Sequence, residues 1–223
     1  MHQQINKKIL IYFFLFIIFG TLNNKNLIDF KIFKIKNIKV SGLEDERNLD
    51  IKKNLDLLKL RNILFLDKEK IKEIIYSSSF VEDFSIFKRY PSELEINIYK
   101  TNFLAYVKKK NEIFFLGSNR KLIKTNDEIE KIPYIFGNFD DREFFKFKDI
   151  IDNSNFDYKE IKNLFFFPSK RWDIETQTGV LIKLPKDRLK DSLELALNLL
   201  SDRNFKNIKM IDLRQKNQVI INE

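Results

Sequence analysis

Cysteine is absent from the 223 residues, and histidine occurs once, at His2. Without cysteine there is no disulfide, no thiolate metal site and no cysteine nucleophile. His2 precedes a long apolar segment, which excludes a histidine base or a histidine-rich metal site beyond that segment. The five glycines stand singly and form no phosphate-binding loop. A carboxylate-only site or a Ser–Lys pair stays formally open, but no motif supports either, so we expect no enzyme, no catalytic residue, no metal and no cofactor.

The charge balance is basic, with a formal net charge of +9. Such a balance can indicate nucleic acid or an anionic membrane surface as a partner. Here the lysines are scattered through every predicted element, with no arginine-rich stripe. Frequent Lys, Asn, Ile and Phe with few Gly and Pro are also typical of an AT-rich genome, and we prefer that interpretation. We therefore expect no nucleic-acid partner, with a membrane-tethered binder of anionic ligands as the alternative.

Residues 9–22, ILIYFFLFIIFGTL, form an uncharged run after a short basic start. The run is short for a span of about 20 residues, and its length also suits the apolar region of a signal peptide. The poor cleavage site at Gly20–Asn23 favours an uncleaved anchor, with flanking residues and local bilayer thinning covering the missing length. We predict a cytoplasmic tail at 1–8, a transmembrane signal-anchor at 9–22 and a linker at 23–32; cleavage is the alternative.

A compact strand–helix–helix–strand–strand pattern follows. Apolar residues at helical spacing mark two helices, and Asp67 is placed to cap the second. Alternating apolar residues and a Tyr90-Pro91-Ser92 turn mark the strands. The predicted strands are 33–41, 81–89 and 94–98.

Short strands with turn signals dominate from residue 101 onward. The segment 140–163 is charged and rich in phenylalanine, and we expect it to be helical in parts. The apolar periodicity at 189–200 predicts an amphipathic helix. The other predictions are hairpins at 103–116 and 171–184 and strands at 208–213 and 218–221.

Residues 80–107, FVEDFSIFKRYPSELEINIYKTNFLAYV, resemble the POTRA domain of the FtsQ/DivIB family. They combine a valine-led strand, an arginine, an aromatic–proline turn, a Leu-x-Ile-x-Ile strand and an Ala-aromatic strand. The family often has Glu-Arg-x-Pro where this chain has Tyr99-Lys100-Thr101-Asn102, so the likeness weakens at the junction.

The C-terminal half carries further motifs that are similar to the β-domain of the same family. They are Arg171-Trp172-Asp173-Ile174, Gly179-Val180-x-Ile182-x-Leu184-Pro185, Ile211-Asp212-Leu213-Arg214 and Ile132-Pro133-Tyr134-Ile135-Phe136-Gly137. The resemblance implies an α+β fold: an N-terminal transmembrane helix, a POTRA domain (β-α-α-β-β) at 33–100, and a mostly antiparallel β-domain with helices at 101–223.

The resemblance also implies a function. Such a chain would be a scaffold of the divisome in septum formation, a single-pass inner-membrane protein with its C-terminal domains in the periplasm. It would bind an FtsB- and FtsL-like pair, with FtsK- and FtsW-like proteins as further partners and no small-molecule substrate. A POTRA-containing protein of export or outer-membrane assembly is the alternative.

The last strand is the candidate docking edge, because a partner segment can pair with an exposed strand. The predicted partner-binding residues are Arg171, Arg214, Gln218, Val219, Ile220 and Ile221. For Trp172 we favour core packing over partner contact. We interpret Asp173 and Asp212 as hydrogen-bonding residues of turns or strand ends rather than as a catalytic pair. Both arginines could equally be solvated charges.

Overall fold

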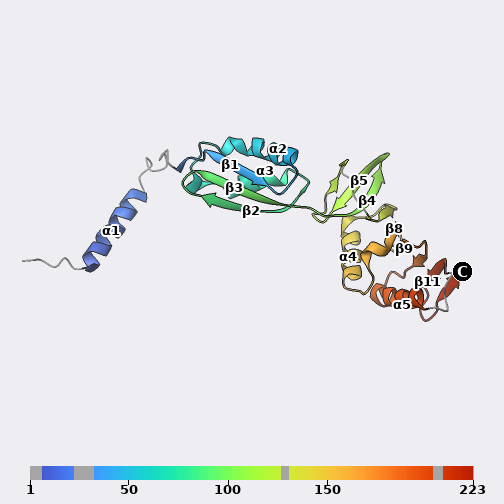
Figure 1. The fold of residues 1–223 in the computed structure, drawn as a ribbon. Coiled ribbons are helices and arrows are strands. Elements are labelled where there is room, and N and C mark those ends of the chain that lie inside the picture. Colours follow the sequence, from blue (N-terminus) through green and yellow to red (C-terminus); the bar gives the residue numbers. More distant parts are fainter. Residues whose placement is uncertain (1–6, 23–32, 127–130, 203–207, 223) are drawn as a thin grey trace, which may run out of the picture. The chain divides into compact units, whose positions relative to one another are not determined.

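The computed structural model describes residues 7–22, 33–126, 131–202 and 208–222 (Figure 1). The chain divides into two compact units between Lys100 and Thr101. Each unit has its own cluster of buried apolar side chains. The predicted linker at 23–32 and most of the predicted tail at 1–8 lie outside the described residues.

The apolar segment forms helix α1, Lys7–Leu22, which has 16 residues. Across the described ranges, no helix has both the length and the apolarity needed to cross a membrane. The transmembrane helix expected at 9–22 is therefore not found as such. At a rise of about 1.5 Å per residue, a helix of this length is shorter than the roughly 30 Å hydrocarbon core.

The N-terminal unit has the predicted order of strand, two helices and two strands. The first strand lies parallel to the last, which also pairs antiparallel with the middle strand of the sequence, giving the sheet order β1-β3-β2. The elements are β1 (Asn37–Ser41), α2 (Asp45–Leu55), the short 3-10 turns η3 (Asp56–Leu58) and η4 (Ile63–Phe65), α3 (Lys68–Tyr76), β2 (Val81–Arg89) and β3 (Glu93–Lys100).

Local sequence accounts for the start of helix α3 but not for the start of the first strand. The Asp67 carboxylate accepts from the backbone N–H groups of Glu69 and Lys70 at 3.0 and 3.3 Å, which confirms the predicted cap. The predicted strand 33–41 is shorter, because the backbone of Ile35 bonds to the η3–η4 segment instead of the sheet.

The C-terminal unit is built on a nine-stranded sheet with the order β12-β11-β10-β9-β8-β7-β4-β5-β6. Among the described strands, five of the eight neighbouring pairs are antiparallel, which fits a mostly antiparallel domain. The elements are β4 (Phe103–Lys109), β5 (Glu112–Gly117), β6 (Leu122–Ile123), β7 (Tyr134–Phe136), α4 (Asp141–Asp152), the 3-10 turn η5 (Tyr158–Glu160), β8 (Ile161–Phe166), β9 (Trp172–Thr176), β10 (Leu181–Lys183), α5 (Leu189–Ser201), β11 (Met210–Asp212) and β12 (Ile220–Asn222).

Both predicted hairpins and both predicted helical regions of this unit are confirmed. Strand β4 pairs with β5, and β9 with β10, each antiparallel. Helix α4 begins after Asp140, whose carboxylate accepts from the N–H of Arg142 at 2.9 Å. The two closing strands are shorter than predicted, since the ladder is confined to Met210–Asp212 and Ile220–Asn222.

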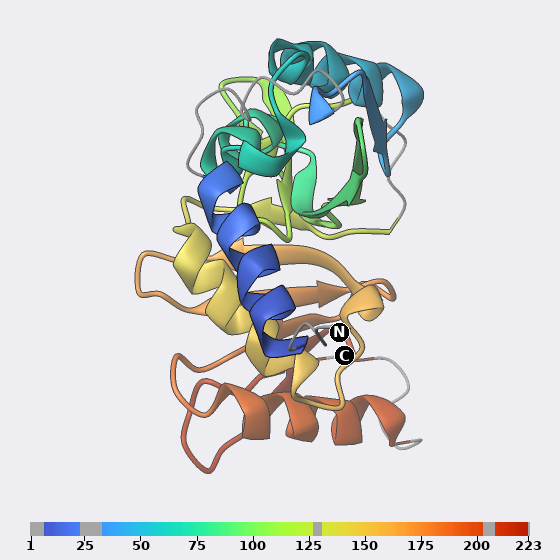
Figure 2. The ribbon, with the colours of Figure 1, turned by 90° about the vertical axis from the view of Figure 1, so that its left-hand side faces the viewer.

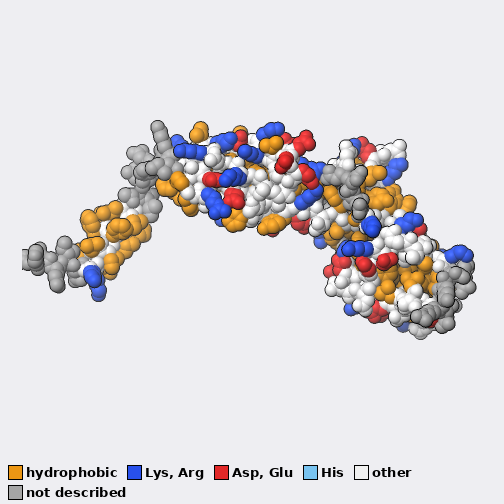
Figure 3. All heavy atoms as spheres, in the orientation of Figure 1, with side chains coloured by type: hydrophobic (Ala, Val, Ile, Leu, Met, Phe, Trp, Pro, Cys, Tyr) orange, Lys and Arg blue, Asp and Glu red, His pale blue; other side chains and the backbone are white. Residues whose placement is uncertain are grey.

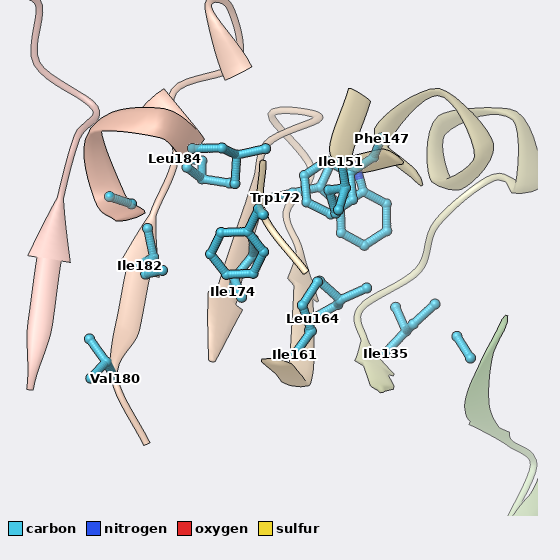
Figure 4. Close-up of a cluster of buried hydrophobic side chains, with 14 of the residues drawn as sticks. Ile135, Phe147, Ile151, Ile161, Leu164, Trp172, Ile174, Val180, Ile182 and Leu184 are labelled. Atoms are coloured by element: carbon cyan, nitrogen blue, oxygen red, sulfur yellow. The ribbon is translucent and has the colours of Figure 1, made fainter. Parts of the chain in front are cut away.

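The core of this unit lies between the sheet and helices α4 and α5 (Figure 2). Trp172 on β9 is 2% exposed and stacks on Phe147 of α4 with ring centroids 5.0 Å apart. Figure 4 shows the indole among Ile151, Leu164 and Ile174. The prediction that this tryptophan packs in the core is confirmed.

Candidate partner-binding edge of the C-terminal sheet

Strand β12 lies at one edge of the nine-stranded sheet. It pairs antiparallel with β11, with Ile221 opposite Ile211 and Ile220 opposite Asp212. Its other side pairs with no strand among the described residues. The outward backbone N–H and C=O groups of such a strand can pair with an added strand.

A row of paired residues leads from the middle of the sheet to this edge. Asp173 pairs with Lys183, Lys183 with Asp212, and Asp212 with Ile220. Residues directly opposite each other in neighbouring strands point to the same face of a sheet. The flanking residues of these strands belong to the core, so the row lies on the face opposite α4 and α5.

Arg214 pairs with Asp212, the residue of this row next to Ile220. Its Nε lies 2.8 Å from Oδ1 and 3.0 Å from Oδ2 of Asp212, whose Oδ1 also accepts from the Arg214 backbone N–H. Asp212 is 5% exposed. The guanidinium holds the pKa of the Asp212 carboxyl below its usual range, against the effect of burial. Arg214 is therefore not an ordinary solvated charge.

Arg171, immediately before β9, has a similar role two strands further into the sheet. Its Nε lies 3.0 Å from Oδ1 of Asp173, and its guanidinium lies 4.2 Å from the centre of the Phe167 ring. The same Oδ1 accepts from the Leu184 N–H at 3.3 Å. Burial raises the pKa of Asp173 more than the arginine lowers it. Both aspartates thus make local hydrogen bonds, as predicted, although they also share the row.

The structure separates the residues predicted for the last strand. Ile220 is exposed at the end of the row, whereas Ile221 turns to the other face and packs against the core. Gln218 and Val219 precede β12 and lie outside it. Both line a hollow of about 210 Å³ between the Leu213–Val219 segment and helix α5, where Leu195 is exposed.

Aromatic side chains cover the other half of the same face, and they were not predicted from the sequence. Tyr134 and Phe136 on β7 lie edge to face at 4.3 Å between centroids, and Phe136 stacks on Phe165 of β8 at 4.9 Å. Tyr106 of β4 meets Tyr134 at 5.0 Å. The alternation Tyr134-x-Phe136 was the available signal, since residues two apart share a face.

Within the ranges that the structure describes, no group of three or more His, Cys, Asp or Glu residues is placed to hold a metal ion. The aspartates of the row are engaged by arginines, which suits positioning rather than proton transfer. The site is a strand edge beside a polar row and a small hollow.

Two family models match this architecture. The POTRA domain, FtsQ-type, matches residues 33–99, and the C-terminal domain of cell division protein FtsQ/DivIB matches residues 105–214. The chain belongs to the FtsQ/DivIB family. Its two structural units therefore correspond to the two FtsQ/DivIB modules.

Individual proteins that are similar to this chain carry the names FtsQ and DivIB. The cell division protein FtsQ of Rickettsia bellii is 23% identical over 201 residues, covering 85% of this chain and 72% of the relative. The cell division protein DivIB of Clostridium botulinum is 26% identical over 133 residues, covering 60% of this chain and 50% of that protein. The extracytoplasmic domain of DivIB from Geobacillus stearothermophilus is 19% identical with a TM-score of 0.35, covering 48% of this chain and 98% of that domain.

The FtsQ/DivIB match ends at Arg214, at the ion pair with Asp212. Strand β12 lies beyond the matched residues, so its place at the sheet edge comes from the structure alone. The family match thus identifies the class of protein, and the sheet order identifies the candidate docking edge.

Proposed function

We propose that this FtsQ-like chain is a non-catalytic scaffold of the division machinery. It links early and late divisome proteins and binds an FtsB- and FtsL-like pair by strand addition to β12. The observation that carries the proposal is the unpaired outer side of β12 among the described strands. Strand addition takes its affinity from backbone hydrogen bonds and its specificity from alternate side chains.

The residues around the edge favour a partner whose side chains also contact this chain, in addition to backbone pairing. Ile220 offers an apolar side chain at the rim of the polar row, where Lys183 and Arg214 supply positive charge. An acidic side chain on the incoming strand would lie near that charge. The hollow beside Val219 would accept an apolar side chain of the partner next to the added strand.

We further propose that residues 9–22 attach the chain to the inner membrane, with 33–223 in the periplasm. Helix α1 is apolar around its whole circumference, and its large side chains are exposed (Figure 3). A helix that is hydrophobic on all sides favours a lipid or protein surrounding over water. Residues flanking the helix and local thinning of the bilayer would cover the remaining length.

Co-purification of the full chain with an FtsB- and FtsL-like pair tests the docking edge. Ile220→Pro should abolish capture, because proline disturbs ladder pairing on the docking strand. Leu122→Pro, on the opposite edge strand β6, is the matched control and should still capture the pair. Thermal melts must show that both variants are folded. Capture by a folded Ile220→Pro variant at the level of the unmodified chain would exclude β12 as the docking edge.

A further inference from the structure

One end of the N-terminal unit presents apolar side chains to solvent. We call this surface the entry surface; it is lined by exposed Leu57, Leu60, Leu64, Phe65 and Tyr90. Leu60 is 74% exposed and Phe65 66%. Figure 3 shows hydrophobic side chains on the surface of this unit. Clustered apolar residues on a soluble domain mark a site of interaction.

The backbone that carries the entry surface is fixed in place. Leu58 and Ile63 of the same segment are buried in the core of the unit. The Asn62 side chain accepts from the Leu64 N–H at 2.9 Å. The exposed leucines therefore belong to a segment whose backbone is anchored by buried side chains and a hydrogen bond.

Leu60 also adopts a left-handed backbone conformation, with φ of 69°. Residues with a side chain rarely adopt that region, because Cβ comes too close to the following carbonyl oxygen. Leu60 is not among the apolar side chains that pack on the core of this unit, so packing does little to offset that strain. Strained backbone of this kind is concentrated at functional sites.

The entry surface lies where the chain enters the unit after helix α1. Ile35 donates its N–H to the carbonyl of Arg61 at 3.0 Å and accepts from the N–H of Leu60 at 3.1 Å. Lys36 donates to the carbonyl of Ser92, in the turn that carries Tyr90, at 2.9 Å. Eleven residue steps separate Leu22 from Phe33, so the end of α1 lies within roughly 40 Å of this region.

Positive charge surrounds the apolar residues. The segments 34–36, 56–67 and 88–93 contain six Lys or Arg residues and three Asp or Glu residues. Of the three acids, Asp56 pairs with Lys59, Glu93 with Lys39, and Asp67 caps α3. Apolar side chains ringed by Lys and Arg with a tyrosine at the rim suit the interface of an anionic bilayer.

We propose that the entry surface docks on the anionic lipid surface next to the membrane-attached helix. The leucines and Phe65 enter the headgroup region, and the surrounding cations contact lipid phosphates. The proposal rests on the membrane attachment proposed above. Docking would hold the N-terminal unit against the bilayer.

The absence of cysteine allows a local test with single-cysteine variants of the full chain. Leu64→Cys on the entry surface, Phe16→Cys in α1 and Glu46→Cys are each labelled with bimane. Glu46 lies in the first turn of α2, beyond the far end of β1, and serves as the control. The chains are reconstituted in bilayers of phosphatidylcholine and phosphatidylglycerol, with or without bromine on the acyl chains, which quenches bimane within the bilayer.

We expect brominated lipid to reduce emission at positions 64 and 16 but not at 46. If brominated lipid quenches the label at position 16 but not at 64, docking is overturned and the attachment stands. If it quenches the label at 64 but not at 16, the attachment through α1 is overturned and docking stands. If it quenches neither label, both proposals are overturned. If emission at 64 shifts to the blue but brominated lipid does not quench it, the label is covered by protein, either a second copy or residues 23–32. That result also overturns docking.

Two further variants separate specific docking from mere proximity to the bilayer. In the Leu64→Cys background, Leu60→Ser with Phe65→Ser should remove most of the quenching. Leu49→Ser replaces an exposed leucine of α2 outside the entry surface and should leave it unchanged. Equal quenching in both backgrounds, or the same quenching in phosphatidylcholine alone, would contradict docking through these side chains and charges.

Discussion

Arg214 holds the carboxylate of Asp212, two residues earlier, with its Nε 2.8 Å from one oxygen and 3.0 Å from the other. Asp212 is nearly fully buried, whereas the arginine side chain is 41% exposed. Asp212 is also the cross-strand partner of Ile220 at the sheet edge. The ion pair therefore fixes the end of β11, the strand that pairs with the candidate docking strand β12.

Replacing Arg214 by Glu should lower the free energy of unfolding of the C-terminal unit by roughly 1–3 kcal/mol. The change leaves a buried carboxylate beside a second negative charge, although partial exposure of the site moderates the cost. Arg214→Lys keeps the charge but not the two-pronged geometry, so it should cost less. Urea denaturation followed by circular dichroism measures both. Equal stability of Arg214→Glu and the unmodified chain would contradict the structural role of the pair.

Asp212 should contribute to acid sensitivity of folding. Its pKa is lower in the folded chain than in the unfolded one, so its stabilisation is complete above the unfolded pKa and is lost as pH falls through the folded pKa. Asp173 acts in the opposite sense: its raised pKa makes its ionised form destabilising at higher pH. Asp212→Asn should therefore flatten the loss of stability below about pH 4. Urea midpoints that fall in parallel for the variant and the unmodified chain would refute this assignment.

Trp172→Ala should destabilise the C-terminal unit by about 3–5 kcal/mol. The indole stacks on Phe147 and contacts the ring of Phe166, with centroids 4.7 Å apart in the second pair. Trp172→Phe keeps some of that packing and should cost less. Thermal melts followed by circular dichroism suit both, since they do not depend on the tryptophan. Unchanged melting with lost partner binding would mean that Trp172 is a contact residue.

Two glycines provide a matched pair in the two units. Gly42 has φ of 110°, and an added Cβ would lie 1.8 Å from the carbonyl oxygen of Ile98. Gly179 has φ of 88° with open space around it. Gly179→Ala should cost only the backbone strain of about 1–2 kcal/mol, while Gly42→Ala should cost more because backbone must move. Equal losses in denaturant midpoint would show that the close approach to Ile98 is not fixed.

Features encoded by nearby residues were predictable from the sequence. The cap at Asp67, the apolar spacing of α5 and the turn between β9 and β10 each depend on a few neighbouring positions, and all are confirmed. The turn at Tyr90–Ser92 belongs to the same class. Local chemistry also accounts for the ion pair between Asp212 and Arg214, because the two residues lie two positions apart.

Features that depend on long-range pairing were not predictable. Alternation over 33–41 did not reveal that Ile35 bonds to Arg61, so the first strand was predicted too long. The aromatic cluster requires β7 to lie between β4 and β8, which no local pattern encodes. The left-handed Leu60 carries no glycine or asparagine signal. Whether the predicted partner-binding residues bind a partner stays a prediction.

Amide hydrogen exchange of the full chain, alone and with the FtsB- and FtsL-like pair, tests strand addition most directly. Newly paired backbone amides exchange more slowly, so β12 (Ile220–Asn222) should gain protection on binding. The opposite edge strand β6 (Leu122–Ile123) should exchange at the same rate with and without the pair. Unchanged exchange in β12 while the pair is bound, or protection confined to β6, would contradict docking at this edge.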